Sequence, residues 1–187
     1  MATDRVSEAF AAAPREWFLP EDQRERAGYD GPLDIGHGQT NSQPRTVESM
    51  LRLLDVHRGH RVLDVGSGSG WTTALLAELV GSTGRVRGVE LEPDLVGFGR
   101  ANLAHGDWPH ATIDQATPGT YGDPAHAPYD RILVSAQATE LPTTLVDQLA
   151  PDGRMVIPVN GEMLLVEQSG EEPVVSRHGY YRFVPLR

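Results

Sequence analysis

The sequence contains no cysteine and no lysine, and its sixteen cationic side chains are all arginine. Without cysteine, the chain has no disulfides, no thiolate nucleophile and no cysteine-ligated zinc. Without lysine, it cannot form a catalytic Schiff base, and it lacks the lysine of a phosphate-binding P-loop. A compositional bias of the genome explains the preference for arginine, and the chemical exclusions hold in either case.

Positive charge and long apolar runs are scarce as well. The formal net charge is −10 at pH 7, and an acidic surface repels phosphate backbones, so we expect no nucleic-acid partner. Apolar residues make up 39% of the chain, enough for one globular core, but no stretch is long enough to span a membrane. No apolar leader opens the chain. These features predict a cytoplasmic protein with a single domain over residues 1–187, and we expect it to be a monomer.

The seven histidines show no spacing typical of a metal site, so we expect no bound metal. His57 and His60 are three residues apart, but they lie at an expected junction between a helix and a strand. His37 differs from the others because it lies in a polar loop with other candidate site residues. We expect it to contact substrate or to support that loop.

Hydrophobic periodicity predicts alternating strands and helices, followed by strands alone. The expected helices cover residues 3–13, 46–54, 71–80, 93–104 and 142–149, and the expected strands cover 61–65, 86–90, 111–114, 130–135, 154–159, 163–168 and 174–184. Residues 28–45 are rich in Gly, Pro, Asn and Gln and are expected to be irregular. The order predicts an α/β fold, with a core over residues 61–187. This core is a doubly wound, mostly parallel Rossmann-like sheet of about seven strands, with an antiparallel edge and helices on both faces.

The most informative segment is D-V-G-S-G-S-G, which runs from Asp64 to Gly70 at the end of an apolar strand. Glycine adopts positive φ and has no side chain, so the backbone can lie flat against a ligand, and the next helix presents unpaired N–H groups. The third glycine comes one position too early for the dinucleotide fingerprint G-x-G-x-x-G. The pattern resembles motif I of the class I methyltransferases that use S-adenosyl-L-methionine (SAM) and release S-adenosyl-L-homocysteine.

A second carboxylate, Glu90, ends the next apolar run, where it could accept hydrogen bonds from both ribose hydroxyls of the cofactor. Asp64 could pair with the cationic amino-acid end of SAM, directly or through water. The alternative is a plain glycine-rich turn between a strand and a helix, but the second acid favours cofactor binding. The expected cofactor-binding residues are Asp64, Gly66, Ser67, Gly68, Gly70, Glu90, Leu91, Asp114 and Gln115.

Residues 35–44, I-G-H-G-Q-T-N-S-Q-P, combine glycines with many short hydrogen-bonding side chains. Such a loop could bind a peptide backbone and a carboxylate, although composition alone would favour a polar surface turn. It resembles the I-G-x-G-Q-T-x-S-Q-P segment of the protein-L-isoaspartate O-methyltransferases. Residues 14–20 (P-R-E-W-F-L-P), 147–158 (D-Q-L-A-P-D-G-R-M-V-I-P) and 182–186 (R-F-V-P-L) resemble further segments of that family, in the same order. The resemblance covers nearly the whole chain.

The resemblance implies methyl transfer from SAM to the side-chain-position carboxylate of L-isoaspartyl residues in damaged proteins or peptides. The ester then forms a succinimide, which leads to repair. Carried over by position, Ser42 and Thr40 would be the catalytic hydroxyls. The substrate would be bound by the residues of the same loop and of the closing motif, namely His37, Gln39 and Val184.

Two positions depart from the family pattern. Asp114-Gln115-Ala116 replaces the usual G-D-G, whose acid helps to hold adenine, so either Asp114 or Gln115 substitutes or cofactor affinity is reduced. Asn41 stands where the family often has Ile. These departures leave open a carboxylate methyltransferase with one dedicated peptide substrate. A non-catalytic SAM-fold binding protein is a further alternative, although motif I, Thr40 and Ser42 argue against it.

Overall fold

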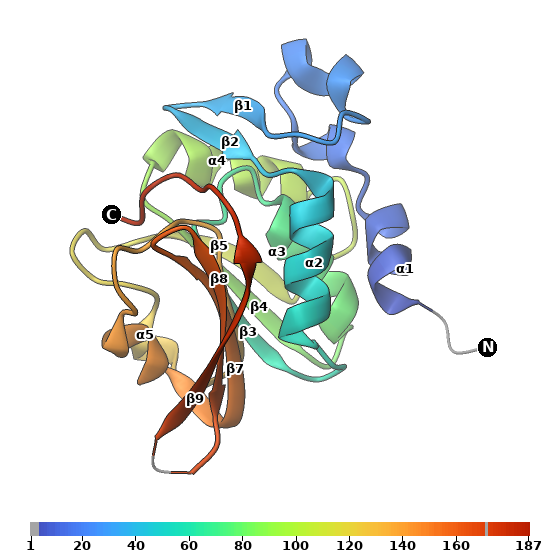
Figure 1. The fold of residues 1–187 in the computed structure, drawn as a ribbon. Helices are drawn as coiled ribbons and strands as arrows, with labels where there is room; N and C mark the ends of the chain where they lie inside the picture. Colours follow the sequence, from blue (N-terminus) through green and yellow to red (C-terminus); the bar gives the residue numbers. More distant parts are fainter. Residues whose placement is uncertain (1–3, 171) are drawn as a thin grey trace.

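The computed structural model describes residues 4–170 and 172–187, and over these residues the chain forms one seven-stranded sheet and one two-stranded hairpin (Figure 1). The five strands from β5 to β7 are parallel, and β8 and β9 complete an antiparallel edge. The predicted fold class is confirmed. In spatial order the strands are β5 (Ala111–Gln115), β4 (Arg85–Glu90), β3 (Arg61–Val65), β6 (Tyr129–Val134), β7 (Leu149–Val159), β8 (Glu162–Gln168) and β9 (Pro173–Tyr180).

Helices cover both faces of the sheet because successive strand residues point to opposite sides. Val62 packs in one core with α1 (Arg5–Ala12), α2 (Pro44–Leu54) and α3 (Trp71–Val80), while Leu63 packs in another with α5 (Thr143–Val146). Helix α3 is buried almost all round. Helix α4 (Pro93–Leu103) packs against α3, β4 and β5. In the described ranges, every helix is too short or too polar to cross a membrane.

The segment 28–45 is more ordered than its composition predicts. It contains a hairpin of β1 (Leu33–Gly36) and β2 (Gln39–Asn41), and α2 already begins at Pro44. Leu33 and Ile35 are buried, while Asp34 between them is exposed. Four residues are too few for this alternation to stand out in the sequence, so the prediction of an irregular segment was wrong over the hairpin.

Two further boundaries differ from the prediction. The helix expected over 142–149 forms only as α5, because Leu149 already pairs with Tyr129 and begins β7. The last strand was expected to reach residue 184, but β9 ends at Tyr180. The chain then crosses toward the hairpin (Figure 1) and is held there by Gln137, whose N–H donates to the Val184 carbonyl over 2.7 Å. The closing motif therefore reaches the carboxyl end of the sheet.

Gly97 and Gly99 both lie within α4, although glycine weakens a helix interior. Gly99 has a packing reason. A Cβ there would lie 2.8 Å from Cδ1 of Ile113 and 3.0 Å from the carbonyl oxygen of Gly68, which is backbone. Only glycine lets α4 approach the glycine-rich turn this closely. Gly97 faces open space, and a Cβ added there would meet no heavy atom within 4 Å.

We expect opposite effects from alanine at these two positions. Gly97→Ala should raise the free energy of unfolding by about 0.4–1 kcal/mol, since alanine restricts the unfolded chain and fits the helix. Gly99→Ala should lower it by about 1–3 kcal/mol through overpacking. Urea unfolding of both variants beside the parent protein measures this. Equal effects of the two substitutions would show that the contact with Gly68 does not constrain α4.

Candidate active site

A cleft opens at the carboxyl ends of the central strands. Strands β3 and β6 are neighbours, although the chain passes outward through β4 and β5 before it returns to β6. Such a switch in strand order leaves a crevice where ligands bind in open α/β sheets. Its walls include residues at the carboxyl ends of three strands, residues of the hairpin and the C-terminal segment 184–187. The strand ends contribute Val65 and Gly66, Glu90 and Leu91, and Ser135 and Ala136.

The glycine-rich turn and Glu90 form one hydrogen-bonded unit. Gly68, with φ +51°, donates its N–H to Oε2 of Glu90 over 2.9 Å, and the N–H of Glu92 donates to Oε1 over 3.0 Å. The Glu90 carboxylate is thus fixed on the cleft wall by two backbone donors. Five of the predicted cofactor-binding residues line this cleft: Gly66, Ser67, Gly68, Glu90 and Leu91.

Asp64 lies behind the cleft rather than on its wall. It is fully buried, and its Oδ2 accepts hydrogen bonds from the hydroxyls of Thr72 and Thr73, each over 2.7 Å. The pKa of Asp64 is raised to about 6, mainly by burial and also by the charge of Glu90, although the two hydroxyls act to lower it. Gly70, also expected at the cofactor, lies under the turn against Gly99.

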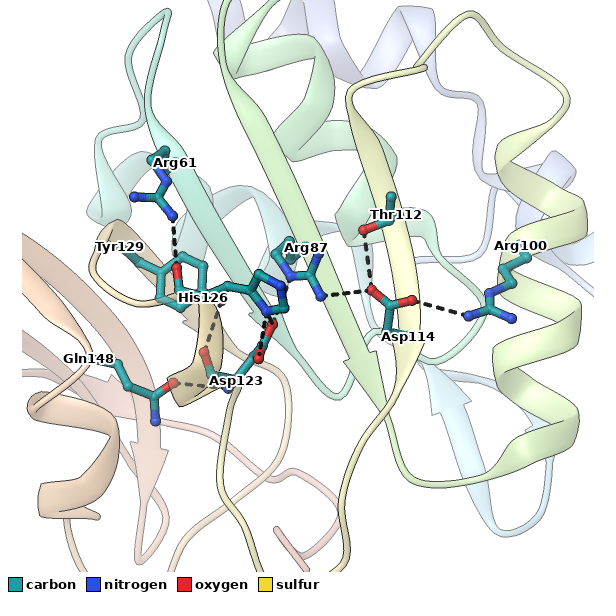
Figure 2. A network of polar contacts seen from close by, with 9 residues as sticks. All are labelled: Arg61, Arg87, Arg100, Thr112, Asp114, Asp123, His126, Tyr129 and Gln148. Atoms are coloured by element: carbon teal, nitrogen blue, oxygen red, sulfur yellow. Dashed lines mark hydrogen bonds and ion pairs between the residues drawn. The ribbon is translucent and has the colours of Figure 1, made fainter.

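Asp114 and Gln115 also lie off this cleft. Asp114 forms ion pairs with Arg87 over 3.0 Å and with Arg100 over 3.1 Å (Figure 2), so its carboxylate stabilises the edge of the sheet at β5. Gln115 donates from Nε2 to the carbonyl of Leu91 over 2.6 Å, which fixes the loop after β4 from behind. Their contact with adenine is expected only from their position along the chain. In the structure, ion pairs with Arg87 of β4 and Arg100 of α4 fix the direction of the Asp114 side chain.

The polar network of Figure 2 instead anchors another cleft wall, the loop that contributes Ala116, Thr120, Tyr121 and Gly122. Asp123, next to that wall, accepts from Nε of Arg87 over 2.7 Å and pairs with His126 over 2.9 Å. Burial acts to raise the pKa of Asp123, but these partners outweigh it and the pKa lies below its ordinary value. Gln148 accepts from the Asp123 N–H and donates to the Tyr121 carbonyl. The loop is therefore fixed from two sides.

The hairpin covers the cleft with the hydroxyls that the sequence predicts. Gln39, Thr40 and Ser42 line it, and Val184 faces them from the C-terminal segment. Within residues 4–170 and 172–187, the hydroxyls of Thr40 and Ser42 have no hydrogen-bond partner, so both can donate to a ligand. His37 is placed elsewhere. It lies at the exposed hairpin tip, with Nε2 3.3 Å from Asp94.

A buried arginine fixes the hairpin in place. Arg15, only 6% exposed, makes six hydrogen bonds to the loop and hairpin, and its guanidinium lies 5.4 Å from the ring centre of Trp71. One of these bonds runs from Nε to Oδ1 of Asn41 over 2.7 Å, and Asn41 donates in turn to Oγ of Ser69 over 3.1 Å. The remaining five reach the backbone carbonyls of Ala27, Tyr29, Gly31, Asn41 and Ser42. Asn41, the departure from the family pattern, thereby links the hairpin to the glycine-rich turn.

Several lining residues were missed by the sequence reasoning. Ser135 and Ala136 directly follow β6, so the rule that located Gly66 after β3 would have found them. Leu186 and Arg187 line the cleft because the chain leaves the sheet at Tyr180, which no periodicity indicates.

A wider groove continues from the cleft toward solvent, and we call it the outer groove. It shares Thr40, Ser42, Ser135 and Val184 with the cleft. Its other lining residues are Pro32, Gln43, Arg45, Thr46, Ser49, Tyr180, Tyr181, Arg182 and Phe183. The four shared residues therefore stand where a ligand in the cleft would meet a ligand in the groove.

The cleft fits a small nucleoside with a positive charge. Oγ of Ser67, at the glycine-rich turn, is buried without a hydrogen-bond partner among the described residues. Oδ1 of Asp64 is unpaired as well, but it lies behind the cleft wall. Glu90 keeps a carboxylate on the wall, and the turn of Gly66 and Gly68 presents backbone without side chains. An unpaired hydroxyl and a carboxylate on the wall favour a ligand that brings hydrogen-bond donors and a positive charge. A cleft of this kind on a doubly wound sheet has the features that a SAM-dependent methyltransferase requires.

Comparisons with known proteins identify the family. The family model described as protein-L-isoaspartate(D-aspartate) O-methyltransferase matches residues 1–187, so the chain belongs to that family. A protein-L-isoaspartate O-methyltransferase of Methanopyrus kandleri is 47% identical over 98% of this chain and 84% of its own length.

Two solved structures agree over nearly the whole chain. A structure named protein-L-isoaspartate O-methyltransferase aligns with a TM-score of 0.89 and 27% identity, over 99% of this chain and 62% of that one. A Plasmodium falciparum structure described as a protein-L-isoaspartate O-methyltransferase in complex with S-adenosyl-L-homocysteine aligns with a TM-score of 0.86 and 28% identity. That alignment covers 100% of this chain and 92% of the other.

The raised pKa of Asp64 predicts a pH dependence of stability. The pKa rises from 3.8 in the unfolded chain to about 6 when folded, so the stabilising effect of protonation is complete below 3.8 and is lost as pH rises through about 6. Asp64→Asn does not titrate. As the pH rises, the free energy of unfolding of this variant should therefore increase relative to that of the parent protein, by up to about 3 kcal/mol. Exposed Asp107→Asn is the control in urea unfolding, and parallel curves for Asp64→Asn and the parent would contradict the prediction.

The link through Asn41 predicts a large effect of an apolar residue at that position. Asn41→Leu leaves the buried Nε of Arg15 without an acceptor and should lower the free energy of unfolding by about 1–3 kcal/mol. Asn41→Asp keeps one oxygen that accepts from Arg15 and places a second where the Ser69 hydroxyl can donate to it, so it should cost less. The midpoints of urea unfolding compare the two variants. A Leu variant as stable as the Asp variant would show that this link contributes little.

Proposed function

We propose that the protein transfers a methyl group from SAM to the side-chain-position carboxylate of L-isoaspartyl residues in damaged proteins or peptides. The observation that carries the proposal is the position of Thr40 and Ser42. Their unpaired hydroxyls line both the cofactor cleft and the outer groove. A carboxylate held by these hydroxyls would lie between a bound peptide and the cofactor.

The residues of the cleft would hold the cofactor. We propose that Gly66 and Gly68 lie against it and that Glu90 accepts hydrogen bonds from its ribose hydroxyls. Ser67 carries an unpaired buried hydroxyl at the same turn. When bound, SAM supplies a methyl group on a cationic sulfur. The buried Asp64 and the fixed Glu90 give this side of the cleft the negative charge that complements such a cation.

The reaction requires positioning rather than a general base. An aspartyl-type carboxylate ordinarily has a pKa of about 3.9 and is ionised at neutral pH. Holding the reacting groups in line supplies several kcal/mol of barrier reduction. Ser42 and Thr40 donate hydrogen bonds that orient the anion without neutralising it. Arg15 lies close by, but its guanidinium donates to the carbonyl of Ser42 and not into the cleft, so it would not blunt the nucleophile.

The product then reacts without help from the protein. The backbone nitrogen of the next residue attacks the methyl-ester carbonyl, methanol leaves, and a succinimide ring forms. Water opens the ring at either carbonyl, and one of the two products is normal aspartate. The net charge of −10 supports a protein or peptide substrate over a nucleic acid.

Two synthetic peptides that differ only in isoaspartate or normal aspartate at one position test the proposal. Transfer of labelled methyl from SAM should be confined to the isoaspartyl peptide. Equal labelling of both would contradict it. Labelling of neither, with SAM binding intact by calorimetry, would favour a dedicated peptide substrate, and the absence of SAM binding would favour a non-catalytic binding protein.

Substitutions at the two sides of the cleft should separate turnover from cofactor binding. Ser42→Ala should lower kcat by about tenfold or more and leave SAM affinity nearly unchanged, because it removes a donor to the acceptor carboxylate. Glu90→Ala should weaken SAM binding by about tenfold or more, because it removes a charged acceptor. Calorimetry gives the affinities, and labelled transfer gives kcat. Equal loss of both properties in Ser42→Ala would mean that Ser42 acts structurally.

A further inference from the structure

The outer groove differs in charge from the rest of the molecule. The protein carries a net charge of −10, yet the residues that line this groove include two arginines and no aspartate or glutamate. Three aromatic side chains complete the wall: Tyr180, Tyr181 and Phe183. An arginine beside aromatic residues is typical of surfaces that bind peptides.

The two arginines of the groove are not equivalent. Arg45 is hydrogen-bonded and ion-paired with Asp30. Arg182 is exposed, and over residues 4–170 and 172–187 it has no ion pair and donates no side-chain hydrogen bond. The neighbouring arginines of the C-terminal region are paired, Arg177 with Glu162 and Arg187 with Glu92. Within the described ranges, Arg182 is thus the groove's cation without an internal counter-ion.

Charge is also separated across the site. Glu90 lies on the side of the glycine-rich turn, where a cationic cofactor would bind, and Arg182 lies on the side of the groove. Arg182 precedes Val184 by two residues, and Val184 lines both the cleft and the groove. A peptide whose acceptor carboxylate reaches Ser42 would therefore pass Arg182 within a few residues of the acceptor.

We infer that the outer groove selects isoaspartyl peptides that carry an acidic residue two positions from the isoaspartate, and that Arg182 determines this preference. The inference rests on the proposed function. An extended peptide places every second side chain on the same face, which sets the distance along the peptide. Complementary charge at an exposed rim contributes to selectivity and association and weakens with salt.

Isoaspartyl peptides with glutamate, glutamine or lysine at these flanking positions, on either side, test the inference. In the parent protein, kcat/KM for the glutamate peptide should exceed that for the glutamine peptide by about two- to fivefold at low salt, the range of an exposed ion pair. The lysine peptide should be the poorest substrate. The preference should shrink at high salt, since exposed charges are screened.

Three variants assign the effect to Arg182. Arg182→Gln should reduce kcat/KM for the glutamate peptide to that for the glutamine peptide, while Arg182→Lys should keep much of the preference. Arg177→Gln removes an exposed arginine outside the groove and should keep the preference in full. A glutamate preference that survives in Arg182→Gln, or equal kcat/KM for all peptides in the parent, would overturn the inference.

Binding separates this inference from the proposed function. Fluorescence anisotropy with labelled peptides and S-adenosyl-L-homocysteine measures the charge preference without turnover. Binding that favours glutamate in the parent but not in Arg182→Gln, without methyl transfer to any isoaspartyl peptide, would reject the proposed function and support the preference. Methyl transfer to isoaspartyl peptides, with an affinity that does not depend on peptide charge, would support the proposed function and reject the preference.

Discussion

The geometry of the active site depends on the buried guanidinium of Arg15. Burial lowers the pKa of Arg15 to about 10, which still leaves it charged at neutral pH. A buried charge is costly unless hydrogen bonds satisfy it, and here the acceptors are the backbone carbonyls of the segment that contains the hairpin. That segment has few apolar residues of its own to bury, so the ion supplies the organising interaction. Thr40 and Ser42 face the cleft because the carbonyls around them converge on one cation.

In this arrangement the positive charge of Arg15 stabilises the scaffold, and the negative charge of Glu90 is directed at the cofactor site. The Arg15 guanidinium, which donates to the carbonyl of Ser42, is saturated by backbone carbonyls and by Asn41, so it does not neutralise an incoming carboxylate that meets the hydroxyl groups. On the cofactor side, Glu90 is held by the backbone N–H groups of Gly68 and Glu92. Groups fixed in advance need little reorganisation at the moment of reaction, which is the main contribution that a protein makes to a simple group transfer.

The sheet, the glycine-rich turn and Glu90 could be predicted because each depends on a local pattern: a run of strand residues, a cluster of glycines, an acid at a strand end. The hairpin could not, because its alternation spans four residues. Asp114 illustrates a second limit, since its direction is set by Arg87 and Arg100 from other elements. The structural role of Arg15 requires partners up to 27 residues away, and the two buried hydrogen bonds of Asn41, which stands where the family often has Ile, join it to residues 15 and 69.

Recognition of carbonyls by Arg15 has an evolutionary consequence for the loop that it holds. Ala27, Tyr29 and Gly31 contribute only their main-chain oxygens to the guanidinium. The contact with Arg15 therefore leaves the exposed Tyr29 side chain free to change. Ala27, by contrast, packs against the cluster of Leu33 and Ile35, and a Cβ at Gly31 would clash with the Tyr29 ring. The exposed surface of this loop can drift between related proteins while the hairpin remains in place, so diversity in side chains here is compatible with one unchanged chemistry.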